Sequence, residues 1–180
     1  MTQVPNRLAI LVALTDHLKA ITPDNGYEFD LSQSVYRGRN LLGADVRGDN
    51  LPLVSILESP RPDIAVYAAE EANWRWDQWT LLIQGLIDDD KRNPSDRAYY
   101  LCAAVEKHLA RLSEVRRETG KPRYPDEYLL GGLVTGMEIA PPVVRPPEDR
   151  VSAAAFFFLP IRVGVAIETS HPYTGDKIHK

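Results

Sequence analysis

The sequence predicts a single α+β domain in which two helices pack on one face of a mostly antiparallel sheet. Three observations support this: two segments with helical apolar spacing, several segments with strand-like alternation, and no internal repeat. Of the 180 residues, 44% are hydrophobic and 26% charged, values typical of a folded globular chain. We assign residues 1–180 to this one domain, with residues 1–5 and 170–180 expected to be flexible.

The first helix is expected to begin near Asn6, a residue type suited to the N-cap. It should end before residues 22–26, a cluster of turn formers. The apolar stripe expected to face the core consists of Leu8, Leu11, Val12, Thr15, Leu18 and Ile21.

Short strands are expected next. Residues 27–31 alternate apolar and acidic side chains, residues 34–37 form a further short strand, and residues 51–58 are rich in β-formers. The glycine-rich residues 38–50 predict a long loop, and residues 63–73 a second excursion from the sheet.

The clearest strand covers residues 74–87, with Trp79, Leu81, Ile83, Gly85 and Ile87 on one face. The second helix is expected to start at Asn93 and Pro94, which suit the N-cap and the first helical position, and to run to about Glu118. A loop over residues 121–132 should follow. The buried stripe of this helix is predicted to contain Ala98, Leu101, Cys102, Val105, Leu109 and Leu112.

The C-terminal part predicts two strands. Residues 133–140 form the first, and residues 141–150 an extended connection stiffened by prolines. The last strand covers residues 153–168, with a bulge or bend at Pro160 and Gly164. One face of it carries Phe157, Leu159, Ile161, Val163, Val165 and Ile167.

Composition argues against several classes of function. The single cysteine, Cys102, can form no intramolecular disulfide and no thiolate zinc cluster, so we expect a reducing cytosol. The net charge of −4 disfavours binding to DNA or to anionic lipid. Residues 153–167 are too short for a membrane span and contain Pro160 and Arg162.

The triplet Asp88, Asp89 and Asp90 is the best candidate for a metal or acid–base site, because Mg²⁺ prefers oxygen ligands. The alternative, which we favour, is a solvated turn at a helix N-terminus. The four histidines form no metal-binding pattern, and Cys102 lies on an apolar stripe. We therefore predict no catalytic residue, metal ligand or cofactor.

Tryptophan and arginine are enriched at protein–protein hot spots, and the chain clusters Trp74, Arg75, Trp76 and Trp79. Trp74 and Trp76 share one face of an extended strand, and Trp79 lies on the other. Some of the three could therefore belong to an interface and the others to an aromatic core. Further arginines lie in the predicted excursions, where they could contact a neighbour or simply keep loops solvated. The candidate interface residues are Arg37, Arg39, Arg47, Trp74, Arg75, Trp76, Arg145 and Arg150.

The chain resembles the phage tail terminator family in its element order and in several phrases. These are ITPDNGYEFDLSQSVYRGRNLLG, PLVSILESPRPD, WTLLIQGLIDDDKRNPSDRAYYL and AFFFLPIRVGV, within about Leu8 to Val165. The resemblance implies an α+β subunit of a hexameric ring that caps the tail tube and stops its polymerisation. It further implies a virion protein of the tail or neck, assembled in the host cytoplasm, with tail-tube protein below it and a neck, head-completion or portal protein above.

DNA would pass through such a ring without specific binding. We hypothesise that Asp88, Asp89 and Asp90 line this lumen and repel the DNA. Three alternatives stay open: an adaptor ring below the portal of a short-tailed phage, a cytosolic metal-binding enzyme that uses this triplet, and a cytosolic adaptor module.

Overall fold

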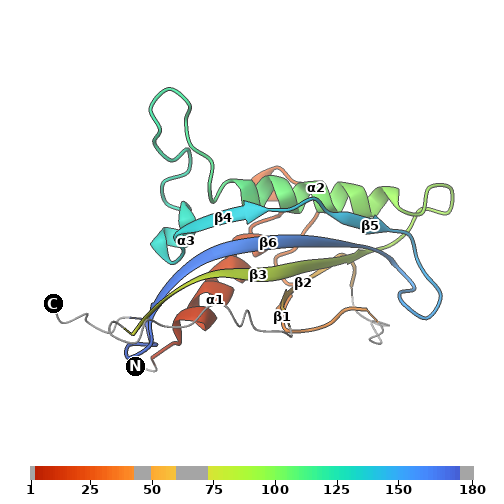
Figure 1. Cartoon of the computed structure of the whole chain (residues 1–180). Helices are drawn as coiled ribbons and strands as arrows, with labels where there is room; N and C mark the ends of the chain where they lie inside the picture. The colour runs from red at the N-terminus through yellow and green to blue at the C-terminus, as the bar shows by residue number, and fades with distance from the viewer. Residues whose placement is uncertain (1–2, 43–49, 60–72, 175–180) are drawn as a thin grey trace.

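The computed structural model describes residues 3–42, 50–59 and 73–174. As predicted, the fold is α+β, with a mixed sheet of six strands (Figure 1). In chain order the elements are α1 (Asn6–Lys19), the 3-10 turn η1 (Pro23–Asn25), β1 (Val35–Arg37), β2 (Leu53–Glu58), β3 (Trp74–Ile87), α2 (Asp96–Ala110), α3 (Leu129–Gly132), β4 (Gly136–Ile139), β5 (Val143–Arg145) and β6 (Ala155–Glu168).

The strand order is β1-β2-β3-β6-β4, and β5 also pairs with β6. Only β1 and β2 run parallel; the other pairings among the described strands are antiparallel. The centre of the sheet is the pair β3–β6, whose register runs from Trp74↔Glu168 to Ile87↔Ala155. No residue is inserted at Pro160 or Gly164, so the expected bulge is wrong, and both strands instead curve along their length (Figure 1).

Pro160 is tolerated in β6 because the neighbouring edge is interrupted beside it. β4 ends at Ile139 and β5 begins at Val143, and between them the Ala140 N–H donates to the carbonyl of Pro160 (2.9 Å). Proline has no N–H to give to a ladder, so the gap costs no hydrogen bond there.

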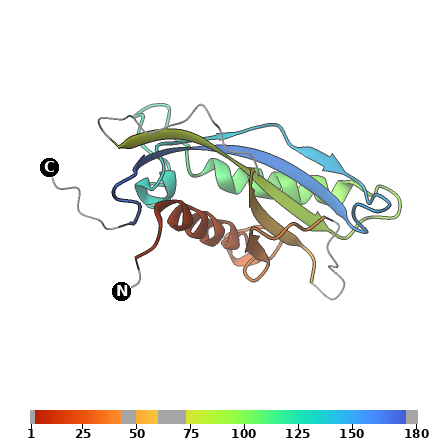
Figure 2. The ribbon, with the colours of Figure 1, turned by 60° about the horizontal axis from the view of Figure 1, so that its bottom comes forward.

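The main core lies on one face of β3 and β6 and contains side chains of both α1 and α2. Figure 2 shows the two helices next to the long strands. The predicted core faces of β3 and β6 and the predicted stripe of α2 are confirmed, since every residue named for them is buried. The α1 stripe is partly wrong: Leu8 is 43% exposed and Val12 only partly buried, whereas Ile10 and Leu14 are buried. Residues 8–14 are all apolar, so the spacing of apolar residues could not decide which side of the helix faces the core.

A second, smaller hydrophobic cluster contains Leu41, Leu53, Leu86, Ala154 and Phe156. Phe156 and Leu86 alternate with the core-facing residues of β6 and β3, so this cluster lies on the opposite face of the sheet. Leu41 is held there because its N–H donates to Gln84 Oε1 (2.6 Å).

Two N-terminal expectations are wrong. Pro5, not Asn6, occupies the N-cap position of α1, because Asn6 instead donates to the backbone carbonyls of His171 (side chain, 3.3 Å) and Pro172 (N–H, 2.8 Å). Residues 27–31 form no strand. Phe29 and Leu31 are still buried, because the Leu31 N–H donates to the Ile21 carbonyl (2.9 Å) and folds the segment onto the end of α1.

The C-terminal half also departs from the expected boundaries. The second helix has Ser95 as its N-cap residue, not Asn93, and it ends at Ala110, well before Glu118. Residues 113–123 instead turn back on themselves, with Arg116 and Arg123 donating N–H groups to the carbonyls of Lys121 and Glu114 (2.8 and 2.9 Å). This turn-back explains the early helix end, and Figure 1 shows it projecting from the fold.

Three further segments differ from the prediction in detail. The strand expected at residues 133–140 is present but shorter, as β4, whereas the expected loop 121–132 contains α3 and the proline-rich connection 141–150 contains β5. α3 is not an ordinary helix, because Leu129, Leu130, Gly131 and Gly132 all have positive φ. None of the helices in the described residues is long and apolar enough to cross a membrane.

Candidate functional site

We call the end of the sheet formed by residues 74–80 and 162–168 the ribbon, because among the described residues 74–77 of β3 and 165–168 of β6 pair only with each other. On one side, β2 covers β3 only from Leu81 to Leu86. On the other side, β4 and β5 reach β6 only as far as Gly164. Within the described residues, β3 before Leu81 therefore has a strand neighbour on one side alone. Open strand edges present unpaired backbone groups that can accept another chain.

The three tryptophans divide between the two faces of this ribbon, as the alternation predicts. Trp79 is buried in the main core, with the Arg7 guanidinium 4.6 Å from its ring centroid. Trp76 is 70% exposed on the opposite face, and its ring stacks on that of Trp74 (centroids 6.5 Å apart). Arg75 points to the core side and is partly buried. Trp74 and Trp76 therefore remain candidate interface residues, whereas Trp79 is part of the core.

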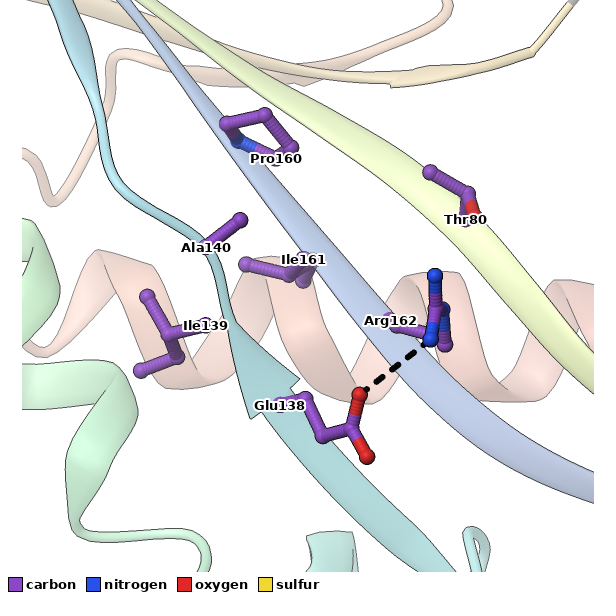
Figure 3. Close-up of a pocket in the computed structure, with 7 residues that line it drawn as sticks. All are labelled: Thr80, Glu138, Ile139, Ala140, Pro160, Ile161 and Arg162. Carbon is purple, nitrogen blue, oxygen red and sulfur yellow. Dashed lines mark hydrogen bonds and ion pairs between the residues drawn. The ribbon is translucent and has the colours of Figure 1, made fainter.

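The same face of the sheet carries a shallow pocket of about 160 Å³ at Thr80, four residues beyond Trp76 along β3 (Figure 3). Ala140 and Pro160 supply its apolar floor at the interruption between β4 and β5. Its rim is polar, with Glu138 and Arg162 paired at 3.4 Å and Thr80 beside them. Val143, 53% exposed, continues the apolar surface along β5. This face thus combines apolar patches with a polar rim, the composition of many protein interfaces.

The other candidate arginines are spread over the fold. Arg37 is exposed at the end of β1, and the Arg39 guanidinium lies 4.8 Å from the Tyr36 ring centroid. Arg145 forms an ion pair with Glu148 of its own chain (2.5 Å), and Arg150 is exposed with a positive φ. Arg47 lies outside the described residues. The candidate arginines that the structure describes therefore do not form one basic patch.

Asp88, Asp89 and Asp90 form an exposed turn between β3 and α2. Asp88 lies 3.9 Å from Arg97, and Asp90 accepts the Arg92 N–H (2.8 Å). These contacts fit the solvated turn that we considered for the triplet.

A buried group of side chains that the sequence did not reveal joins α1, α2 and the segment before α3. His17 and His108 occupy the last turns of the two helices, and their rings stack with centroids 4.1 Å apart. Each Nε2 donates to the backbone carbonyl of the other histidine (2.9 and 2.8 Å). Each of these carbonyls also accepts a backbone N–H at its own helix end, from Ala20 (3.1 Å) and Arg111 (3.2 Å), so each histidine adds a second hydrogen bond at the end of the other helix.

Tyr27, Glu127 and Arg111 make the remaining contacts of this group. His108 Nδ1 accepts the Tyr27 hydroxyl (2.8 Å), and His17 Nδ1 lies 3.6 Å from Glu127 Oε2. The other oxygen of Glu127 binds the Arg111 guanidinium. Burial lowers the pKa of His17 below its ordinary value and lowers the pKa of His108 to about 4. Both imidazoles are therefore neutral at pH 7.

Sequence reasoning missed this cluster because its members lie 91 and 19 residues apart, so no spacing pattern could signal it. His17 and His108 were each assigned only to a helix. Cys102 was interpreted correctly as a core residue: it is buried, and burial raises the pKa of its thiol to about 12. Compared with known protein families and with curated protein sequences, the chain matches none.

Proposed function

We propose that this chain is a tail terminator, a structural virion protein whose copies close into a ring of six on the phage tail tube. The ring ends tube polymerisation, joins the tail to the neck or head, and leaves a lumen through which DNA passes. The observation that supports the proposal on the structural side is the β3–β6 ribbon, whose outer edges have no strand neighbour among the described residues, with Trp76 exposed on its face.

The physical argument starts from what that ribbon lacks. A two-stranded ribbon is marginally stable by itself, and an exposed tryptophan on it favours association. A contact between two different surfaces of identical subunits repeats head to tail, and it closes into a ring when the rotation allows. Ring closure would give every ribbon a neighbour.

The rest of the proposal rests on the resemblance to tail terminators. The protein is not an enzyme. It is assembled in the host cytoplasm and resides in the tail or neck of the virion, with tail-tube protein on one side and a neck, head-completion or portal protein on the other. An adaptor ring of a short-tailed phage would differ in binding the portal instead of a tube.

The first experiment is the mass of the purified protein by multi-angle light scattering over a concentration series, with electron micrographs of any large species. We expect a closed species near six times 20.2 kDa, formed by the protein alone or on addition of tail tubes. A protein that stays monomeric under both conditions would contradict the proposal.

The interface is tested by Trp76→Ser, which removes a large exposed aromatic side chain without touching the core. We expect ring formation to need at least about tenfold more protein, because a hot-spot tryptophan contributes about 2 kcal/mol or more. Tyr100→Ser is the matched control, since Tyr100 is an equally exposed aromatic residue on α2. Equal loss of assembly in both variants would show that Trp76 is not at the interface.

A further inference from the structure

Two hydrogen-bond acceptors face each other in the buried histidine cluster. The ring proton of His17 is on Nε2, since this atom donates to the His108 carbonyl, and Nδ1 therefore presents a lone pair. That lone pair lies 3.6 Å from Glu127 Oε2. Oε2 is itself buried and without a hydrogen-bond partner among the described residues. Two acceptors at this distance repel unless a proton or a cation lies between them.

We propose that His17, His108 and Glu127 bind a divalent transition metal ion of the zinc class, held first by His17 Nδ1 and Glu127 Oε2. Ligand atoms of the three residues lie within 4.8 Å of one another. Two ligands of a tetrahedral zinc ion, at bond lengths near 2.1 Å, lie about 3.4 Å apart. The 3.6 Å between His17 and Glu127 is close to that separation.

The backbone contacts of the histidines suit metal ligands. A metal-bound histidine almost always donates its other ring N–H to a carbonyl or carboxylate, which fixes the ring orientation. Both histidines already do so through Nε2. Their lowered pKa values leave both rings neutral at pH 7, so the ion displaces no proton from them.

His108 is the third ligand, and its coordination has a cost. Its Nδ1 gives up the hydrogen bond from the Tyr27 hydroxyl, because the same lone pair would bind the ion. Arg111 binds the other carboxylate oxygen, Oε1, and leaves Oε2 available, although its positive charge weakens the site. His17 and Glu127 are therefore the ligands on which affinity should depend most.

The ion would join three parts of the chain that are distant in sequence. His17 lies in the last turn of α1, His108 lies in the last turn of α2, and Glu127 lies between the projecting turn and α3. A ligand that binds only the folded state stabilises it, so zinc should raise the melting temperature of the full chain.

The test uses the full chain after removal of metal with a chelator. Zn²⁺ is titrated by calorimetry, and Co²⁺ by its visible absorption, which reports the ligand geometry. The variant His17→Gln keeps a side-chain N–H donor for the His108 carbonyl and removes the Nδ1 ligand. The control is His171→Gln, which changes an exposed histidine 3.1 Å from Glu168.

We expect one ion per chain in the wild type and in His171→Gln, and binding at least about tenfold weaker in His17→Gln and Glu127→Gln. Absence of saturable binding by the wild type, or unchanged affinity in His17→Gln, would overturn the proposal. Nitrogen NMR of the wild-type histidines needs no variant: protons on both ring nitrogens of His17 at pH 7 would show that a proton occupies the position instead.

Discussion

At the residue scale, Gly85 shows how closely β3 and β6 pack. It lies on the core face of β3, opposite Phe157 in the register. A Cβ atom built on Gly85 would lie 2.1 to 2.9 Å from three atoms of the Phe157 ring. Phe157 is fully buried in the main core. The position therefore requires glycine for reasons of space.

Gly85→Ala should lower the free energy of unfolding by about 1–3 kcal/mol, because overpacking displaces a core ring. Gly136→Ala is the matched control in a strand, since its Cβ would meet no atom within 4 Å. We expect the control to change stability by less than about 0.5 kcal/mol. Urea unfolding of the three proteins measures both values, and equal effects in the two variants would refute the packing argument.

At the element scale, the reciprocal histidine bonds tie the ends of α1 and α2 together. Tyr27, Arg111 and Glu127 extend the contact to the turn after α1 and to the segment before α3. Protonation of either histidine places a charge in this buried contact. The fold therefore favours the neutral rings.

This preference predicts the pH dependence of stability. A histidine whose pKa is lower in the folded state than in the unfolded state binds fewer protons when folded, so its stabilising effect is complete above pH 6.5 and declines below it. For His108 the fall from 6.5 to about 4 corresponds to about 3 kcal/mol lost between those pH values, and His17 acts in the same direction.

The measurement is urea unfolding at pH 7.5 and pH 4.5 with a chelator present. His108→Gln keeps a donor for the His17 carbonyl but cannot titrate, so its stability should fall less between the two values than that of the wild type. An identical fall in both proteins would show that His108 is not responsible.

At the scale of the whole molecule, the proposed ring gives the acidic turn after β3 a role in the lumen. Asp88, Asp89 and Asp90 are exposed and belong to neither hydrophobic cluster. Replacement of all three by asparagine should leave ring assembly unchanged, because an asparagine carbonyl at position 90 can still accept the Arg92 N–H.

Phages that carry this triple variant should eject DNA more slowly, because a lumen without these carboxylates repels the phosphates less. Ejection followed by fluorescence of released DNA measures the rate. If the variant fails to form rings, the triplet belongs to the subunit interface, and if ejection is unchanged, it lies outside the lumen.

Much of the fold could be predicted because its largest elements carry their periodicity in the chain. Every residue predicted to face the core in residues 74–87 and 155–168 is buried, although Leu86 and Phe156 on the other face are buried as well. The stripe of α2 is equally clear. Residues 27–31 show the limit of this reasoning, because alternation predicts burial but a strand also needs a neighbour with which to pair.

The sequence by itself therefore determined the α+β class, the two central strands, the core face of α2 and the division of the tryptophans, since each depends on spacing within one segment. Only the tertiary structure showed that β5 pairs with β6, that the described residues supply no strand neighbour at the outer edges of the ribbon, and that His17, His108 and Glu127 meet. These features depend on which distant segments pack together. That choice is made by the whole core and leaves no local pattern in the chain.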